Sequence, residues 1–338
     1  MTDRLARLLP DRFLLMLLGT LLLATLLPVR GAWASRFDML TGLAIAMLFF
    51  LHGAKLSREA ILSGIGAWRL HLMVLATTFV AVPIIGFGLD RAISPFLDPQ
   101  LAMGLLYLVI LPSTVQSSIA MTAIARGNVP AAVCSAALSN LLGIVATPLL
   151  AGLLVHGRMG GAGAGFLLSA IGDIMLTLLL PFVLGHMSRP LTGTFIDRHR
   201  TLVMRVDRGA ILLVVYAAFS AAIVEGLWSR IAVQDLMLVV AGSAALLATI
   251  LLGTRLAARL VGLPVADEIV LVFCGSKKSL ASGVPMAGAL FAPAQVGFII
   301  LPVMIYHQLQ LIVCAAIAQR YAQRDEAAAV LKESLHAL

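Results

Sequence analysis

The chain has 338 residues, of which 61% are hydrophobic and 12% are charged, and its mean hydropathy is +1.03. These values exclude an ordinary soluble domain and predict a polytopic membrane protein. The formal net charge of +8 is explained by basic side chains in the loops of such a protein. We therefore expect a lipid bilayer, and no nucleic acid, among its partners.

The N-terminal segment has the outline of a secretory signal peptide, with basic residues ahead of an apolar run and an Ala-x-Ala pattern at 32–34. The same segment also begins a repeat. Phe13 stands fifteen residues before Pro28, just as Phe166 stands fifteen residues before Pro181. We therefore expect the first apolar run to be kept as a membrane span.

Ten apolar segments are long enough to cross roughly 30 Å of hydrocarbon, which predicts an all-α membrane protein with ten transmembrane helices. The segments are 13–29, 38–54, 70–89, 101–126, 129–155, 165–187, 209–227, 233–257, 267–291 and 295–319. The expected organisation is a cytoplasmic N-terminus at 1–12, a five-helix repeat at 13–155, an outer loop at 156–164, a second repeat at 165–319 and a cytoplasmic tail at 320–338. Because five is odd, the two repeats would be inverted, as in many secondary transporters.

Basic residues set the predicted orientation. If both termini are cytoplasmic, seventeen Lys and Arg fall in inner loops and ends, five fall in outer loops and two lie within a span. Because positive side chains concentrate on the cytoplasmic side, we predict both termini there, in a bacterial inner membrane. The longest inner loop would run from Ser188 to Arg208, and the tail after Ala322 would be helical.

Two segments contain polar interruptions. In the fourth, the run Leu111–Ser118 includes Pro112, which removes a backbone donor and frees carbonyl groups near mid-membrane. In the ninth, the run Phe273–Ser279 holds Lys277 and Lys278, and buried lysines are costly in a membrane unless they face a partner or a water-filled cavity. Paired interruptions in corresponding halves of a chain point to a transporter's binding site.

Each interruption also has a purely structural interpretation: a proline kink repaired by the hydroxyls that follow it for the first, and a salt bridge or snorkelling to the interface for the second. In the second, Gly275 would give flexibility, while Ser276 and Ser279 would cap a new half-helix beginning near Leu280. Two half-helix N-termini and up to two ammonium groups would then meet. That arrangement predicts a receptor for a small organic anion.

The predicted substrate-binding or ion-binding residues lie on both interruptions and on two neighbouring spans. They are Ser113, Thr114, Gln116, Ser117, Ser118, Asn140, Ser276, Lys277, Lys278, Ser279, His307 and Gln308. Asp173, deep in an apolar run, is the candidate counter-ion for the lysines. No metal site and no tightly bound cofactor is predicted. The sequence leaves the oligomeric state open, a homodimer included.

At these residues the chain resembles the bile acid:sodium symporter family, and more closely its branch typified by the seventh member of solute carrier family 10. The likeness covers residues 10–320. It rests on Pro112 in a Ser/Thr-rich break, Ala125-Arg126-Gly127-Asn128, Pro148, Pro181–Gly185 and the break at Gly275. The resemblance implies a panel domain (spans 1, 2, 6 and 7), a core domain (spans 3–5 and 8–10) and alternating access between them. Spans 4 and 9 would be broken and cross.

The sequence departs from the sodium-using members of this family in the ninth-span break. Their glutamate two residues before the glycine and their glutamine two residues after it correspond here to Phe273 and Lys277. Their serine-asparagine pair in the fourth span is matched only by Ser117-Ser118. Because hard cations need several oxygen ligands, usually with a carboxylate, we predict that sodium is not required. The Lys277 ammonium would occupy the space of the ion and could serve in coupling by exchanging a proton.

The chain is thus predicted to be a secondary active transporter of an organic anion, and not an enzyme. One alternative is a sodium-coupled organic anion symporter, and another is a non-transporting sensor or accessory protein on a transporter fold. An intramembrane aspartyl protease would need two juxtaposed membrane aspartates. Beside Gly172-Asp173 the sequence offers no second one.

Overall fold

The computed structural model describes residues 12–55, 65–156 and 164–336, and these are almost entirely helical, with no β-strand within those ranges. The predicted all-α fold is therefore confirmed. Among the described residues, six helices are long and apolar enough to cross a membrane, and two shorter helices are also apolar. The count of ten spans stays a prediction.

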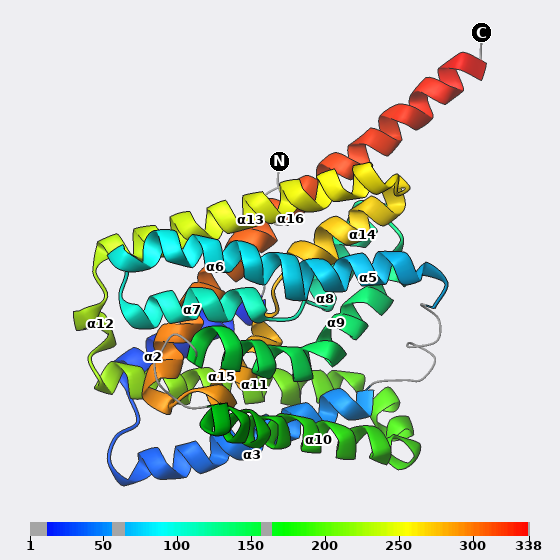
Figure 1. Cartoon of the computed structure of the whole chain (residues 1–338). Helices are drawn as coiled ribbons and strands as arrows, with labels where there is room; N and C mark the ends of the chain where they lie inside the picture. Colours follow the sequence, from blue (N-terminus) through cyan, green and yellow to red (C-terminus); the bar gives the residue numbers. More distant parts are fainter. Residues whose placement is uncertain (1–11, 56–64, 157–163, 337–338) are drawn as a thin grey trace. The chain divides into compact units, whose positions relative to one another are not determined.

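The chain divides into two compact units, and the first comprises residues 1–56, 176–232 and 284–300. Its helices are α2 (Arg12–Leu26), α3 (Ala32–Lys55), most of α10 (Ala164–Arg198), α11 (Arg200–Val224) and α12 (Leu227–Arg230). Within this unit α11 packs against both α2 and α3 (Figure 1).

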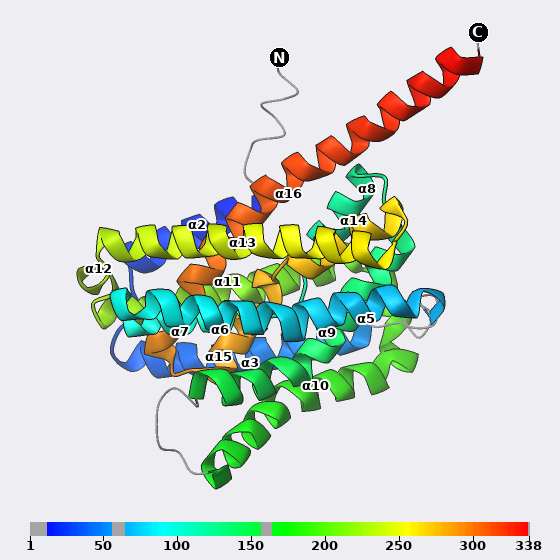
Figure 2. The ribbon, with the colours of Figure 1, turned by 45° about the horizontal axis from the view of Figure 1, so that its top comes forward.

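The second unit comprises residues 57–175, 233–283 and 301–338. Its complete elements are η1 (Ile65–Ala67), α5 (Trp68–Ala76), η2 (Thr77–Ala81), α6 (Val82–Ile93), η3 (Ser94–Phe96), α7 (Pro99–Ile110), α8 (Gln116–Ile124), α9 (Val129–Leu150), η4 (Ala151–His156), α13 (Val233–Val261) and α14 (Val265–Ser276). The residues of α15 (Leu280–Leu290) and α16 (Pro293–His336) are shared between the units. Helices α5 and α6 continue one another through η2, a turn of π-helix, and α13 lies along α6 (Figure 2).

Within the first unit, α3 and α10 cross with their backbones in contact. A Cβ atom added at Gly53 would lie 1.9 Å from the Phe182 carbonyl oxygen, and one added at Gly185 would lie 2.0 Å from the Phe50 carbonyl oxygen. Only glycine fits at such a crossing, which is typical of helix pairs in membranes.

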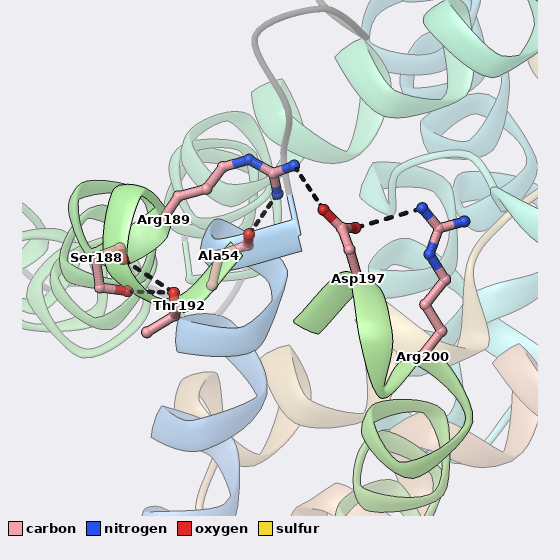
Figure 3. A network of polar contacts seen from close by, with 6 residues as sticks. All are labelled: Ala54, Ser188, Arg189, Thr192, Asp197 and Arg200. Atoms are coloured by element: carbon pink, nitrogen blue, oxygen red, sulfur yellow. Dashed lines mark hydrogen bonds and ion pairs between the residues drawn. The ribbon is translucent and has the colours of Figure 1, made fainter. Parts of the chain in front are cut away.

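The predicted inner loop from Ser188 to Arg208 is wrong, because α10 continues to Arg198 and α11 begins at Arg200. Polar contacts hold the end of α10 and the start of α11 (Figure 3). The Arg189 guanidinium donates a hydrogen bond to the Ala54 carbonyl at the end of α3 (2.6 Å) and lies 3.7 Å from the Asp197 carboxylate, which also pairs with Arg200 at 3.4 Å. A basic, polar stretch that looked like a loop is therefore helix.

The turn between α8 and α9 sits beside the start of α14 in the second unit. Arg126 adopts a left-handed backbone conformation with φ of 59°, which is uncommon for a residue other than glycine. The next residue must be small, because a Cβ atom added at Gly127 would lie 2.6 Å from Ile269. Asn128 caps α9 by accepting a hydrogen bond from the Ala131 amide (3.1 Å).

The two ends of the chain are only partly described. Helix α16 runs to His336, which confirms the predicted helical tail, but side chains after Arg324 lie outside the described part. Most of the predicted N-terminal segment 1–12 and of the outer loop 156–164 also lies outside it.

Candidate functional site at two helix breaks

Two helices are interrupted where the sequence predicts it. Helix α7 ends at Ile110 and α8 begins at Gln116, while α14 ends at Ser276 and α15 begins at Leu280 (Figure 1). Ser279 caps α15 by accepting a hydrogen bond from the Ser282 amide at 3.1 Å, as predicted. Ser276 does not cap it, because it forms the last turn of α14.

The two breaks contact each other directly. The Ser279 amide donates a hydrogen bond to the Pro112 carbonyl (2.9 Å), and the Ser118 hydroxyl donates one to the Phe273 carbonyl (3.3 Å). Polar groups that a continuous helix would pair internally are thus paired between the breaks. This arrangement satisfies backbone groups that would otherwise be costly in a membrane.

Hydroxyl groups complete the break between α7 and α8. The Ser113 amide donates to the Ser139 hydroxyl (3.0 Å), and the Thr147 hydroxyl donates to the Ile110 carbonyl (2.9 Å). Thr114 lies 2.8 Å from the hydroxyl oxygens of both Ser117 and Ser118. Hydroxyls of α9, those of Ser139 and Thr147, therefore pair with backbone groups on either side of Pro112.

Asn140 joins the two breaks through its side-chain amide. Its nitrogen donates to the Ser113 carbonyl at 2.8 Å, and its oxygen accepts a hydrogen bond from the Ser282 hydroxyl at 2.8 Å. These contacts hold Asn140 of α9 against both interruptions.

Side chains of α16 hydrogen-bond to the backbone of the break after α14. The Gln310 amide accepts a hydrogen bond from the Lys278 backbone N–H (2.8 Å) and donates one to the Lys278 carbonyl (2.9 Å), and it also lies 2.8 Å from His307 Nδ1. Tyr306 donates to the Ser276 carbonyl at 2.7 Å. Gln310 and Tyr306 were not among the predicted site residues. Their signal was the spacing of Tyr306 and Gln310, which lie four residues apart on one helix face.

The two adjacent lysines have different surroundings, although both are fully buried, with 0% of each side chain exposed. The Lys278 ammonium donates to three backbone carbonyls, those of Thr78 (3.0 Å), Val109 (2.8 Å) and Leu111 (2.8 Å). The Lys277 ammonium donates one hydrogen bond, to the Ser117 carbonyl at 2.8 Å, and lies 5.9 Å from the centre of the Phe273 ring.

Gly275 has a packing role beside these lysines. A Cβ atom added there would lie 3.1 Å from Thr77 and 3.3 Å from Thr254. The glycine, which we expected to give flexibility, thus lets α14 approach η2 and α13 closely. This approach brings Lys278 within reach of the π-helical turn.

Three further predicted residues lie on α8, α16 and α10. Gln116 is exposed in the first turn of α8, and Gln308 is half-buried and makes no hydrogen bond within the described part of the chain. Asp173 belongs to α10, but its side chain lies outside the described part. Its proposed pairing with the lysines therefore stays a prediction.

Comparison with known proteins matches most of the chain to a family. The model of the SBF-like CPA transporter family matches residues 11–323. The chain is 52% identical to an uncharacterized protein of Pseudomonas aeruginosa over 331 residues, which cover 97% of this chain and 98% of that protein. It is 50% identical over 326 residues to the Escherichia coli protein "Putative symporter YfeH", with 96% of each chain covered. It is also 28% identical over 277 residues to mouse sodium/bile acid cotransporter 7, covering 80% of this chain and 79% of that protein.

Proposed function

Because this chain belongs to the SBF-like CPA transporter family, we propose that it is a secondary active transporter of a small organic anion. The family and its named relatives are transporters and not enzymes. The protein is an integral membrane protein that requires a lipid bilayer and a small-molecule substrate. The anionic character of the substrate is our proposal.

The Lys277 ammonium carries the proposal. An ammonium group has three N–H donors, and Lys277 uses one of them, toward Ser117. Its other neighbours are apolar or weakly polar: the Phe273 ring and the thiols of Cys274 and Cys314. Within the described part of the chain no carboxylate pairs with it. A buried ammonium with two N–H groups that lack an acceptor among the described residues favours an anionic ligand.

The start of α8 adds to the positive potential around Lys277. Ser117 lies in the first turn of α8, where unpaired amides and the helix dipole favour a negative group. A carboxylate, sulfate or phosphate on an organic body would satisfy the ammonium and this helix end together. We assign the hydroxyls of Ser117 and Thr114 to the same ligand.

Within the described residues, Lys277 has ammonium N–H groups without an acceptor and Lys278 has none. Lys278 uses three hydrogen bonds on backbone carbonyls, so we assign charge recognition to Lys277 and a supporting role to Lys278. One available positive charge fits a substrate with one anionic group at the site. Asn140, Ser279 and His307 would hold the breaks in position around it.

Alternating access between two bodies is the proposed mechanism. Its support is the division of the chain into two compact units, together with family membership. Ten spans in two inverted repeats, a bacterial inner membrane location and two cytoplasmic termini complete the proposal. A reporter fused after Leu338 tests the orientation, and signal from the outer side of the membrane would contradict it.

Uptake and binding measurements test the anion proposal. Purified protein is screened by thermal shift against bile acids and simple organic carboxylates, sulfates and phosphates, and hits are tested for flux in proteoliposomes. We expect Lys277→Gln to weaken binding of a hit at least about tenfold, the loss of a charge-assisted contact worth about 1.5–3 kcal/mol. Arg200→Gln, which changes an exposed cation, is the control. Unchanged affinity in Lys277→Gln would contradict the role of this lysine.

The same measurements separate the alternatives. Binding without flux would favour a sensor or accessory protein. Strict dependence on sodium would favour a sodium-coupled symporter, as the name of the mouse relative indicates for that protein. We propose sodium-independent transport, because an ammonium group stands within the break where a carboxylate ligand would be needed.

A further inference from the structure

The Lys278 side chain ends among three backbone carbonyls that come from two separate segments. Thr78 belongs to η2, while Val109 and Leu111 lie at the end of α7, and the three oxygen atoms are 2.8–3.0 Å from the ammonium nitrogen. We call these three carbonyls the carbonyl cage. Lys278 is 0% exposed, so water does not reach the ammonium in this conformation.

The Thr78 carbonyl is free because of the π-helical turn and a proline. In an α-helix it would accept a hydrogen bond from the Val82 amide, but that amide donates to the Thr77 carbonyl instead. Continued π-helical bonding would pair the Thr78 carbonyl with the amide of residue 83, but Pro83 has no N–H. The local sequence therefore leaves one carbonyl oxygen without a regular backbone donor.

The carbonyls of Val109 and Leu111 are free because α7 stops at Ile110. The Ser113 amide, which would pair with Val109 in a continuous helix, donates to the Ser139 hydroxyl. The residues that would pair with Leu111 lie in the break. The Ile110 carbonyl, which lies between these two in the chain, accepts a hydrogen bond from the Thr147 hydroxyl. Two oxygen atoms thus face the position that the Lys278 ammonium fills.

The number of acceptors matches an ammonium group. Three carbonyls use all three of its N–H donors, whereas a neutral amine has only two. Clustered backbone carbonyls without a carboxylate are also the type of ligand that replaces the hydration shell of a monovalent cation. We infer that the carbonyl cage is a monovalent-cation site whose resident cation is the tethered ammonium of Lys278.

This inference has a direct chemical consequence. Lys278→Ala removes three methylene groups and the ammonium, the atoms of n-propylammonium, and leaves three buried carbonyls without a donor. A free cation of suitable size should then bind in the cage. The inference bears on transport only through the proposed function, since a resident cation would remove the need for a coupling ion at this position.

Thermal unfolding of the purified full-length protein tests it. We expect Lys278→Ala to lower the melting temperature by more than about 5 °C. Sodium or n-propylammonium should restore much of this loss, while tetramethylammonium, which has no N–H donor and is too bulky to coordinate, should not. Wild type should not respond, and neither should Lys277→Ala, whose ammonium makes one hydrogen bond.

Two results would overturn the inference: a Lys278→Ala protein as stable as wild type, or one whose stability is insensitive to every cation. If Lys278→Ala cannot be purified, Lys278→Met keeps most of the apolar stem and removes the charge. A wild-type melting temperature for Lys278→Met would contradict the role of the ammonium. Because the readout is stability, a failure of anion binding or flux leaves this test unaffected.

Discussion

The Ser279 amide donates a hydrogen bond to the Pro112 carbonyl at 2.9 Å, which joins two helix breaks 167 positions apart in the chain. The break at Pro112 supplies the carbonyl acceptor, and the break before α15 supplies the amide donor. Disturbing one break should therefore disturb the other.

Gln310→Leu should destabilise the protein strongly. The Gln310 amide pairs with both backbone groups of Lys278, and losing it leaves two buried polar groups unpaired, at about 1–3 kcal/mol each. Gln308→Leu is the matched control, two residues away on α16 and without a hydrogen bond within the described residues. The melting temperatures of the two variants give the comparison. Equal losses would show that Gln310 does not hold the break.

Gly185→Ala should destabilise the crossing of α3 and α10. The added Cβ atom would lie 2.0 Å from the Phe50 carbonyl oxygen, so the helices must separate, at a cost of about 1–3 kcal/mol. Gly42→Ala on α3, where no heavy atom lies within 4 Å of the added Cβ, should be neutral or slightly stabilising. The check is thermal unfolding in detergent. A loss in Gly42→Ala as large as in Gly185→Ala would argue against the close crossing.

Asp173→Asn should change binding or flux of the anion if this carboxylate pairs with a lysine in some state of the transport cycle. An ionised aspartate deep in an apolar segment is costly without a cationic partner. Glu225→Gln alters an exposed carboxylate at the end of α11 and should have little effect. Flux measured in proteoliposomes for both variants decides the point. Equal effects would remove the pairing hypothesis.

Several features of this protein follow from its sequence alone. The high hydropathy predicts membrane helices, and the two breaks fall at Pro112 and after Ser276 as expected. These predictions succeed because a missing N–H and a buried ammonium are costly wherever the chain folds in a membrane. The prediction of a loop from Ser188 to Arg208 was wrong because no such energetic cost distinguishes a loop from a helix in this polar stretch. Its polar composition suits a loop equally well as a helix whose side chains pair with one another.

Tertiary structure alone decided how the two lysines differ. Lys277 and Lys278 are identical in type and adjacent, and the extended backbone at Lys277, with φ of −86° and ψ of 142°, directs successive side chains to different sides. What each ammonium meets depends on distant segments. The free carbonyl of Thr78 needs the π-helical turn before Pro83, and the Ser117 carbonyl needs the second half-helix of the other break. No pattern near residue 278 contains that information, because these partners lie more than 150 positions away in the chain.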